Sequence, residues 1–269
     1  YGGLLLCGIN RTHFSSSKKI ALKIITISVT LIQMLDKYLK MILKAPVYDV
    51  ASVTSLDYLQ GLSARIGSDI LLKREDTQPV FSYKIRGAYT LMASLPPEIM
   101  DKGVIAASAG NHAQGVALSA RALNTSAIIV MPKTTPEIKV KSVSSLGGEV
   151  ILHGDNYDDA SKRAEEIAEE KELMIIPPYD DPYVVAGQGT VGMEILQQSK
   201  KDIDAIFVPV GGGGLIAGIA VYFKSLSPST KIIGVEPLEA PSMSIALKKG
   251  MPVTLEKVGI FADGAAVKR

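Results

Sequence analysis

Short apolar segments alternate with helical segments from residue 104 onward, and this alternation constrains the fold more than any other feature of the sequence. Strands are expected at 104–108, 127–131, 149–152, 205–210 and 231–236, with an edge strand at 173–176. Helices are expected at 111–123, 137–146, 158–172, 215–226 and 240–249, and within 183–199. Because the strands are apolar on both faces, the pattern predicts parallel sheets flanked by helices, an α/β fold.

The chain before this alternation is less regular. We expect a short basic amphipathic helix within 36–50 that ends before Pro46. Residues 51–68 are interpreted as helix and turn, because Thr54 and Ser55 are N-cap residue types ahead of apolar positions. A short strand at 70–72 then leads into the charged turn Lys73–Asp76.

Composition excludes several classes of protein. The formal net charge is only +2, and aromatic residues make up 6% of the chain with no Trp. Both values argue against a nucleic-acid partner held by phosphate neutralisation or base stacking. The single cysteine excludes a disulfide framework, and because no zinc-ligand spacing is present we expect no metal. Hydrophobic residues, at 47%, suffice for a folded core.

The first 35 residues differ in composition from the rest. They contain no acidic residue before Asp36, but several basic residues and the run Ser15–Ser17. Two interpretations stay open, an organelle transit segment and a stray terminus. The charge-free run 24–35 is too short to span a membrane, which needs about 20 apolar residues. Since the chain begins with Tyr1, we expect it to be a fragment.

Four consecutive glycines, Gly211–Gly214, separate an expected strand from an expected helix. Glycine lacks a Cβ, so the N–H groups of this loop can approach an anion closely, and the helix N-terminus adds unpaired donors. The loop lacks the Lys-Ser/Thr of a nucleotide P-loop. It matches the outline of a dinucleotide site with Glu236 as the ribose-binding acid, and equally a tight strand–helix turn. We interpret it as a phosphate cradle whose ligand stays open.

Lys84 lies in a segment with aromatic neighbours, Phe81 and Tyr83, and is followed by Ile85. Burial among such side chains lowers the pKa of an amine and makes it a nucleophile or a base. The alternative is an ordinary solvated lysine, with Phe81 and Tyr83 packed in the core.

A small polar turn, Ser108–His112, joins another expected strand to its helix. Its N–H groups and hydroxyl can hold a carboxylate, although Ser108 and Asn111 are also explained as N-cap residues. His112 is interpreted as a structural histidine rather than a base. A second glycine-rich segment, Gly187–Thr190, is a candidate for donating hydrogen bonds to an anion, or alternatively a helix-entry turn.

An amine, a phosphate-sized cradle and a carboxylate-sized turn on one α/β scaffold match the needs of pyridoxal 5'-phosphate with an amino-acid substrate. The amine serves the cofactor aldehyde, the cradle serves its phosphate, and the turn serves the substrate carboxylate. The sequence therefore favours this cofactor over a dinucleotide.

The motifs resemble those of the threonine deaminases (threonine dehydratases of the biosynthetic type), a family of fold-type II pyridoxal-phosphate enzymes. The resemblance covers roughly residues 38–269. It rests on Lys73–Asp76, Gln78–Ala88, Ser108–Gly115, Pro177–Pro178, Gly187–Thr190, Pro209–Leu215 and Phe261–Gly264, which occur in the family's order.

The resemblance implies a catalytic domain like the tryptophan synthase β-subunit at 38–269, with a smaller subdomain at roughly 86–180, after an extension at 1–37. It implies that Lys84 is catalytic: it bonds covalently to the cofactor and later removes the substrate Cα proton. The implied cofactor-binding residues are Lys84, Tyr83, Asn111, Gly211, Gly212, Gly213, Gly214 and Leu215. The implied substrate-binding residues are Ser108, Ala109, Gly110, Asn111 and His112.

Two departures from the family pattern stand out. The family usually has Phe at the position of Tyr83, whose hydroxyl then needs a partner. The family's catalytic domain also continues past Phe261–Gly264 with a serine that faces the pyridine nitrogen, and a regulatory domain usually follows. We therefore expect a chain incomplete at its C-terminus, with an open sheet edge, that is unstable or inactive alone.

The implied activity is a lyase reaction of isoleucine biosynthesis that converts L-threonine, with L-serine as a second substrate, to 2-oxobutanoate and ammonia. The family is tetrameric, so a homo-oligomer is expected. Related alternatives are serine racemase, a catabolic serine/threonine dehydratase and threonine synthase. Ala109, Ala113 and the four-glycine loop favour the biosynthetic dehydratase over these alternatives. Alternatives of another class are a nicotinamide dehydrogenase and an inactive fragment.

The basic N-terminus favours a mitochondrion, with plastid and cytoplasm open.

Overall fold

The computed structural model describes residues 32–259 and 262–268. The chain divides into two compact units, Tyr1–Lys37 and Tyr38–Arg269. The transit-segment interpretation falls almost wholly outside the described residues. Within them, the first helix runs over 32–44 and ends before Pro46, as predicted, and a short 3-10 helix follows at Val47–Asp49. No helix of these described ranges is long and apolar enough to cross a membrane.

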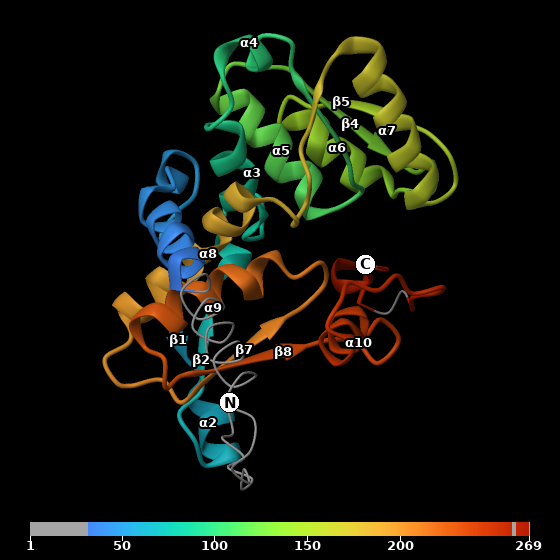
Figure 1. The fold of residues 1–269 in the computed structure, drawn as a ribbon. Helices are drawn as coiled ribbons and strands as arrows, with labels where there is room; N and C mark the ends of the chain where they lie inside the picture. Colours follow the sequence, from blue (N-terminus) through green and yellow to red (C-terminus); the bar gives the residue numbers. More distant parts are fainter. Residues whose placement is uncertain (1–31, 260–261, 269) are drawn as a thin grey trace, which may run out of the picture. The chain divides into compact units, whose positions relative to one another are not determined.

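A four-stranded parallel sheet in the order β5-β4-β3-β6 forms one core of the second unit. Its strands are β3 (Val104–Ala107), β4 (Ala127–Met131), β5 (Glu149–Leu152) and β6 (Met174–Ile175). Helices α5 (Asn111–Ala122) and α6 (Glu137–Ser145) lie on one face, and α7 (Tyr157–Lys171) lies on the other (Figure 1). Ile129 packs on the α5 side and Ile128 on the α7 side, because successive residues of a strand point to opposite faces.

The second sheet has two parallel strands, β7 (Ala205–Pro209) and β8 (Lys231–Val235), followed by α9 (Gly214–Leu226) and α10 (Ser242–Lys249). Phe207 is 67% exposed and Val235 is 50% exposed. Residues 32–259 and 262–268 therefore leave part of this sheet uncovered. The expectation of strands buried on both faces is correct for β3 and β4 but wrong here.

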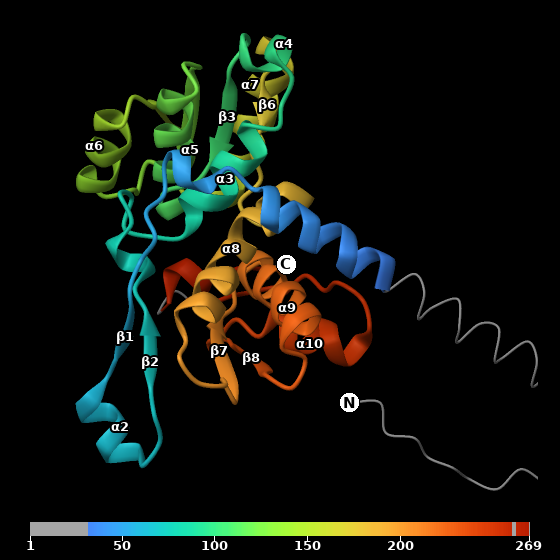
Figure 2. The same ribbon diagram turned by 90° about the vertical axis from the view of Figure 1, so that its left-hand side faces the viewer.

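A third, antiparallel pair joins β1 (Leu56–Tyr58) to β2 (Leu71–Lys73), with α2 (Gln60–Ile66) at its tip (Figure 2). The short strand predicted at 70–72 is confirmed as β2, but its partner β1 was not predicted, because three residues are too few to show a period. The N-cap interpretation of Thr54 is wrong. Its N–H donates to Glu194 and its hydroxyl donates to Glu75, so Thr54 bonds to two carboxylates distant in sequence rather than to the N-terminus of a helix.

Three helices connect the sheets: α3 (Lys84–Met92), α8 (Pro182–Gln198) and α9. Helix α8 packs against both of the others, and the contacts need glycine. A Cβ on Gly187 would lie 2.4 Å from the carbonyl oxygen of Arg86, and a Cβ on Gly218 would lie 2.5 Å from the amide nitrogen of Gly189. The prediction of an anion-binding or helix-entry turn at Gly187–Thr190 is therefore wrong. These residues lie inside α8, where they allow close helix packing.

The remaining elements are short: η2 (Glu75–Thr77), α4 (Pro97–Met100) and η3 (Asp263–Ala265). Every strand and helix predicted from residue 104 onward is present, with small differences at the ends. The α/β fold with parallel sheets flanked by helices is confirmed.

Candidate active site

Lys84 is the first residue of α3, and its amine is largely withdrawn from water. Its Nζ donates a hydrogen bond of 2.7 Å to the carbonyl oxygen of Pro178. The ring centroids of Tyr83 and Tyr179 lie 5.6 and 5.9 Å from the same nitrogen. Burial lowers the pKa of Lys84 to about 8. The predicted desolvation is thus confirmed, although Phe81 takes no part in it: this residue is 73% exposed, with a φ of 58°.

The loops that follow β3 and β6 meet at one edge, because these strands are parallel neighbours. His112, near the start of α5, lies within 2.8 Å of the Ile176 carbonyl oxygen through its Nε2. Burial, with a smaller contribution from the charge of Lys84, lowers the pKa of His112 to about 3. The ring is therefore neutral, and Nε2–H must be the donor because a carbonyl only accepts. The interpretation of His112 as structural is confirmed.

Gly115 brings α5 against the backbone of the lysine. A Cβ at this position would lie 3.2 Å from the carbonyl carbon and oxygen of Lys84 and 3.3 Å from the amide nitrogen of Ile85. This role of Gly115 was not predicted. Its only signal is a glycine one turn into a helix, where glycine costs about 1 kcal/mol relative to alanine and so indicates a packing reason.

The glycine loop lies between β7 and α9, and Gly213 has a φ of 88°, which a residue with a side chain rarely adopts. A Cβ on Gly212 would lie 2.2 Å from the ring of Tyr179. Tyr179 therefore contacts the loop and also lies beside Lys84. It links the two predicted parts of the site, and it was missed because nothing in the sequence shows where the segment after β6 runs.

The N-termini of α5 and α9 differ from those of α7 and α8. Asn156 caps α7 and Asp181 caps α8 through side-chain hydrogen bonds. The N-cap residue of α5 is Gly110 and that of α9 is Gly213. Neither glycine has a side chain that could cap its helix. The first-turn N–H groups of both helices are thus available to an anion.

The N-cap explanation for the polar turn fails for a specific reason. The hydroxyl of Ser108 accepts from the N–H of Gly110 at 3.2 Å, which is upstream of the helix. Asn111 is the first helical residue and is exposed. The turn therefore leaves the start of α5 open, as a carboxylate site requires.

Glu236 does not serve a ribose. Its two carboxylate oxygens accept hydrogen bonds of 2.8 Å from the N–H groups of Met243 and Ser244, at the start of α10. This side chain caps a helix. The dinucleotide alternative therefore lacks the acidic residue that would bind the ribose.

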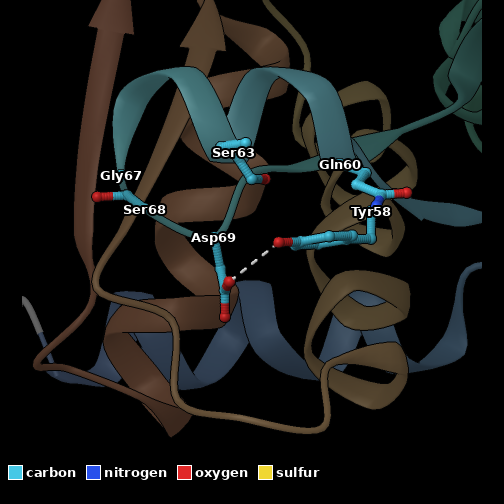
Figure 3. A pocket seen from close by; sticks show the side chains of 7 residues that line it. Tyr58, Gln60, Ser63, Gly67, Ser68 and Asp69 are labelled. Carbon is cyan, nitrogen blue, oxygen red and sulfur yellow. Dashed lines mark hydrogen bonds between the residues drawn. The ribbon is translucent and has the colours of Figure 1, made fainter.

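A pocket of about 300 Å³ lies beside α2, away from these residues (Figure 3). Its lining residues are Tyr58, Gln60, Ser63, Ala64, Gly67, Ser68 and Asp69. The hydroxyl of Tyr58 donates to Asp69 at 3.3 Å across it. None of the predicted site residues lines this pocket, so it does not belong to the candidate active site.

The fold and the site together define an α/β protein in which a largely buried lysine and a glycine loop at an uncapped helix N-terminus both lie beside Tyr179. These residues fit pyridoxal phosphate: the lysine suits its aldehyde and the loop suits its phosphate. The chain belongs to the pyridoxal-phosphate dependent enzyme family, whose model matches residues 47–269.

Two curated relatives are biosynthetic enzymes. Threonine dehydratase 1 biosynthetic, chloroplastic, of Solanum lycopersicum is 60% identical over 232 residues, which are 86% of this chain and 38% of the relative. The L-threonine dehydratase biosynthetic IlvA of Pasteurella multocida is 57% identical over 233 residues, which are 87% of this chain and 45% of the relative. The chain thus spans less than half the length of these relatives.

Solved structures agree on the fold. Processed threonine deaminase isoform 2 from Solanum lycopersicum superposes with a TM-score of 0.86 at 55% identity, over 88% of this chain and 65% of that one. Maize serine racemase gives 0.82 at 33% identity, over 85% and 70%.

The expected mitochondrial location is wrong. Plant relatives are named chloroplastic, and further relatives are bacterial. A basic N-terminus without acidic residues is common to transit segments of both organelles, so this composition does not separate them.

Proposed function

We propose that the protein containing this chain deaminates L-threonine to 2-oxobutanoate and ammonia, with L-serine as a second substrate, in isoleucine biosynthesis. The observation that carries the proposal is the partly buried amine of Lys84, which shares its neighbour Tyr179 with the glycine loop, in a chain 57–60% identical to biosynthetic threonine dehydratases. We further propose a homo-oligomer, as the resemblance implies.

The proposed roles follow the two open helix ends. Backbone N–H groups of Gly211–Leu215 would hold the cofactor phosphate at the start of α9. The turn Ser108–His112 would hold the substrate carboxylate at the start of α5, with Asn111 also bonded to the cofactor ring oxygen. Tyr83 would pack beside the cofactor. The uncapped helix starts and the contact between Tyr179 and Gly212 support this placement.

Lys84 is the group we assign to proton transfer at the substrate Cα. With a pKa of about 8, a large fraction of its amine is neutral near that pH and able to accept a proton. His112 is unsuited to this role, because its Nε2–H is donated to a carbonyl and its pKa is about 3. Pyridoxal phosphate, when bound, supplies an aldehyde for the amine and a conjugated ring that stabilises negative charge at Cα.

The proposal is tested by incubating the full-length protein with pyridoxal phosphate, reducing it with borohydride and mapping the labelled peptide. We expect the label on Lys84, and loss of both label and 2-oxobutanoate production in Lys84→Arg. The matched control is Lys162→Arg, at an exposed position on α7, which should retain both. A label on another lysine would refute the proposed site.

Serine racemase is the second candidate, favoured by the 0.82 TM-score of the maize enzyme. Chiral chromatography of the products formed from L-serine separates the two activities. Formation of D-serine faster than keto acid would favour the racemase over the dehydratase.

A further inference from the structure

Arg86 is the most deeply buried cation of the described residues, and it lies two residues after Lys84 in the first turn of α3. Its side chain is 0% exposed. All five guanidinium N–H groups have partners: two bonds of 2.8 Å to Glu75, one of 2.6 Å to Glu194, one of 3.1 Å to Thr190, and one of 3.3 Å to the Ser52 carbonyl.

The surroundings of Arg86 are balanced in charge. Lys73 donates 2.6 Å to Glu194, whose side chain is 1% exposed, so two cations face the two carboxylates of Glu75 and Glu194. Tyr48 adds a bond of 2.9 Å to Glu194. Burial alone would raise the pKa of Glu194, but the bonds from Arg86, Lys73 and Tyr48 outweigh it and hold that pKa below its usual value.

The partners of Arg86 form a stripe along one face of α8. Gly187, Thr190 and Glu194 recur at helical spacing, and each contacts Arg86: the glycine at its carbonyl, the other two at its guanidinium. The backbone and the side chain of Arg86 are thus both fixed on the same helix. This sets the register of the start of α3 along α8.

The same polypeptide segment also supplies the partner of the lysine. Pro178 lies four residues before α8 begins, and its carbonyl accepts the hydrogen bond from Lys84. The distance between the Lys84 Nζ and the Pro178 carbonyl oxygen therefore depends on how α3 packs on α8. We propose that Glu194 is a positioning residue for Lys84: acting through Arg86, it fixes the first turn of α3 so that the amine stays at Pro178 and away from water.

The significance of this inference rests on the proposed function, but its test does not. The readout is the pH dependence of acetylation of Lys84 in the cofactor-free, full-length protein, pulsed with acetic anhydride and followed by mass spectrometry. The wild-type midpoint is expected near 8. Failure of Lys84 to take up pyridoxal phosphate would refute the proposed function and leave this readout intact.

Two variants separate positioning from general stability. Glu194→Gln removes the charge that fixes Arg86, and we expect the Lys84 midpoint to rise by at least about one pH unit as the first turn opens to water. Glu194→Asp keeps the charge and shortens the reach, so it should fold and shift the midpoint in the same direction by less. Glu169→Gln, at an exposed position on α7, is the matched control and should leave the midpoint unchanged.

Each result decides the question. A raised midpoint in both Glu194 variants supports positioning. An unchanged midpoint with a lower melting temperature would show that Glu194 only stabilises the fold, and would overturn the proposal. A lowered midpoint in Glu194→Gln would indicate through-space repulsion from Arg86 without displacement, and would also overturn it.

Discussion

The two parts of the candidate site are held in opposite ways. The surroundings of Lys84 are held by side-chain contacts. Buried carboxylates fix Arg86 on α8, and two aromatic rings lie beside the amine. At Gly211–Gly214, the absence of side chains matters, because the ring of Tyr179 occupies the space that a Cβ on Gly212 would need. The lysine part thus depends on long-range contacts of specific side chains, and the glycine part depends on backbone conformation.

This difference predicts how each part fails. Removing one buried ion leaves its partners charged and unpaired, which destabilises the whole fold. Adding a methyl group to the loop creates a local clash and is expected to affect ligand binding more than folding. The following predictions separate these two kinds of failure.

The largest effect is expected for Arg86→Met. This change leaves Glu75 and Glu194 facing a single cation, Lys73, in a site closed to water. Breaking a buried pair costs about 3–5 kcal/mol of unfolding free energy. Urea denaturation followed by circular dichroism measures the loss. Arg121→Met, at an exposed position on α5, should change stability by no more than about 0.5 kcal/mol. Equal losses in the two variants would contradict the assigned importance of the network.

The next effect concerns pH, and it sharpens the contrast because only the lysine part titrates near neutrality. Burial lowers the pKa of Lys84 from 10.5 to about 8. Its amine lies beside the Pro178 carbonyl, the rings of Tyr83 and Tyr179 and the neutral ring of His112, and none of these carries a negative charge. Between pH 8 and 10.5 the unfolded chain binds more protons at this residue, so its contribution to stability rises with pH.

Lys84→Met removes this titration. The unfolding free energy of the wild type should therefore rise relative to that of the variant as pH increases from about 8 to about 10.5, with a constant difference below this window. Urea denaturation of both proteins across the range provides the measurement. Parallel profiles would mean that Lys84 has an ordinary pKa in the folded protein.

A smaller effect is expected for Gly212→Ala. The added methyl group meets the Tyr179 ring at 2.2 Å, so either the ring or the loop must shift. Overpacking of this kind costs about 1–3 kcal/mol, which corresponds to a loss of roughly fivefold to 150-fold in pyridoxal phosphate affinity. An absorbance titration measures it. Gly264→Ala is the control, since nothing lies within 4 Å of its added Cβ. Similar affinities for both variants would show that the loop does not approach the ligand.

The same contrast explains what the sequence could predict. Strands β3 and β4 were located from their apolar runs, and Gly211–Gly214 was singled out as a candidate phosphate cradle because four glycines before a helix are a local signal. Helix α3 was missed because all of its residues after Lys84 are buried, including Arg86, so it shows no amphipathic period.

The ion network was missed for a different reason. Lys73 and Glu75 were interpreted as parts of a charged turn, which is normally solvated. The partner of Lys73, Glu194, lies 121 residues further along the chain, and no local pattern reports a contact over that separation. Tyr179 was missed in the same way, because its position depends on the path of the chain after an edge strand. Local signals identified the glycine part, and tertiary contacts decided the lysine part.

The smallest effect is expected at the edge of the glycine part, for Lys268→Ala. The segment that ends at Lys268 lies over the loop, where a Cβ on Gly211 would be 3.1 Å from Val267. Lys268 bonds to Asp158 on α7 at 2.6 Å, but the two side chains are 44% and 63% exposed. Exposed pairs contribute about 0–1 kcal/mol, so cofactor affinity should fall by less than about fivefold, and by less still in high salt. A loss as large as that of Gly212→Ala would mean that this contact holds the segment over the loop, and that the glycine part also depends on side-chain charge.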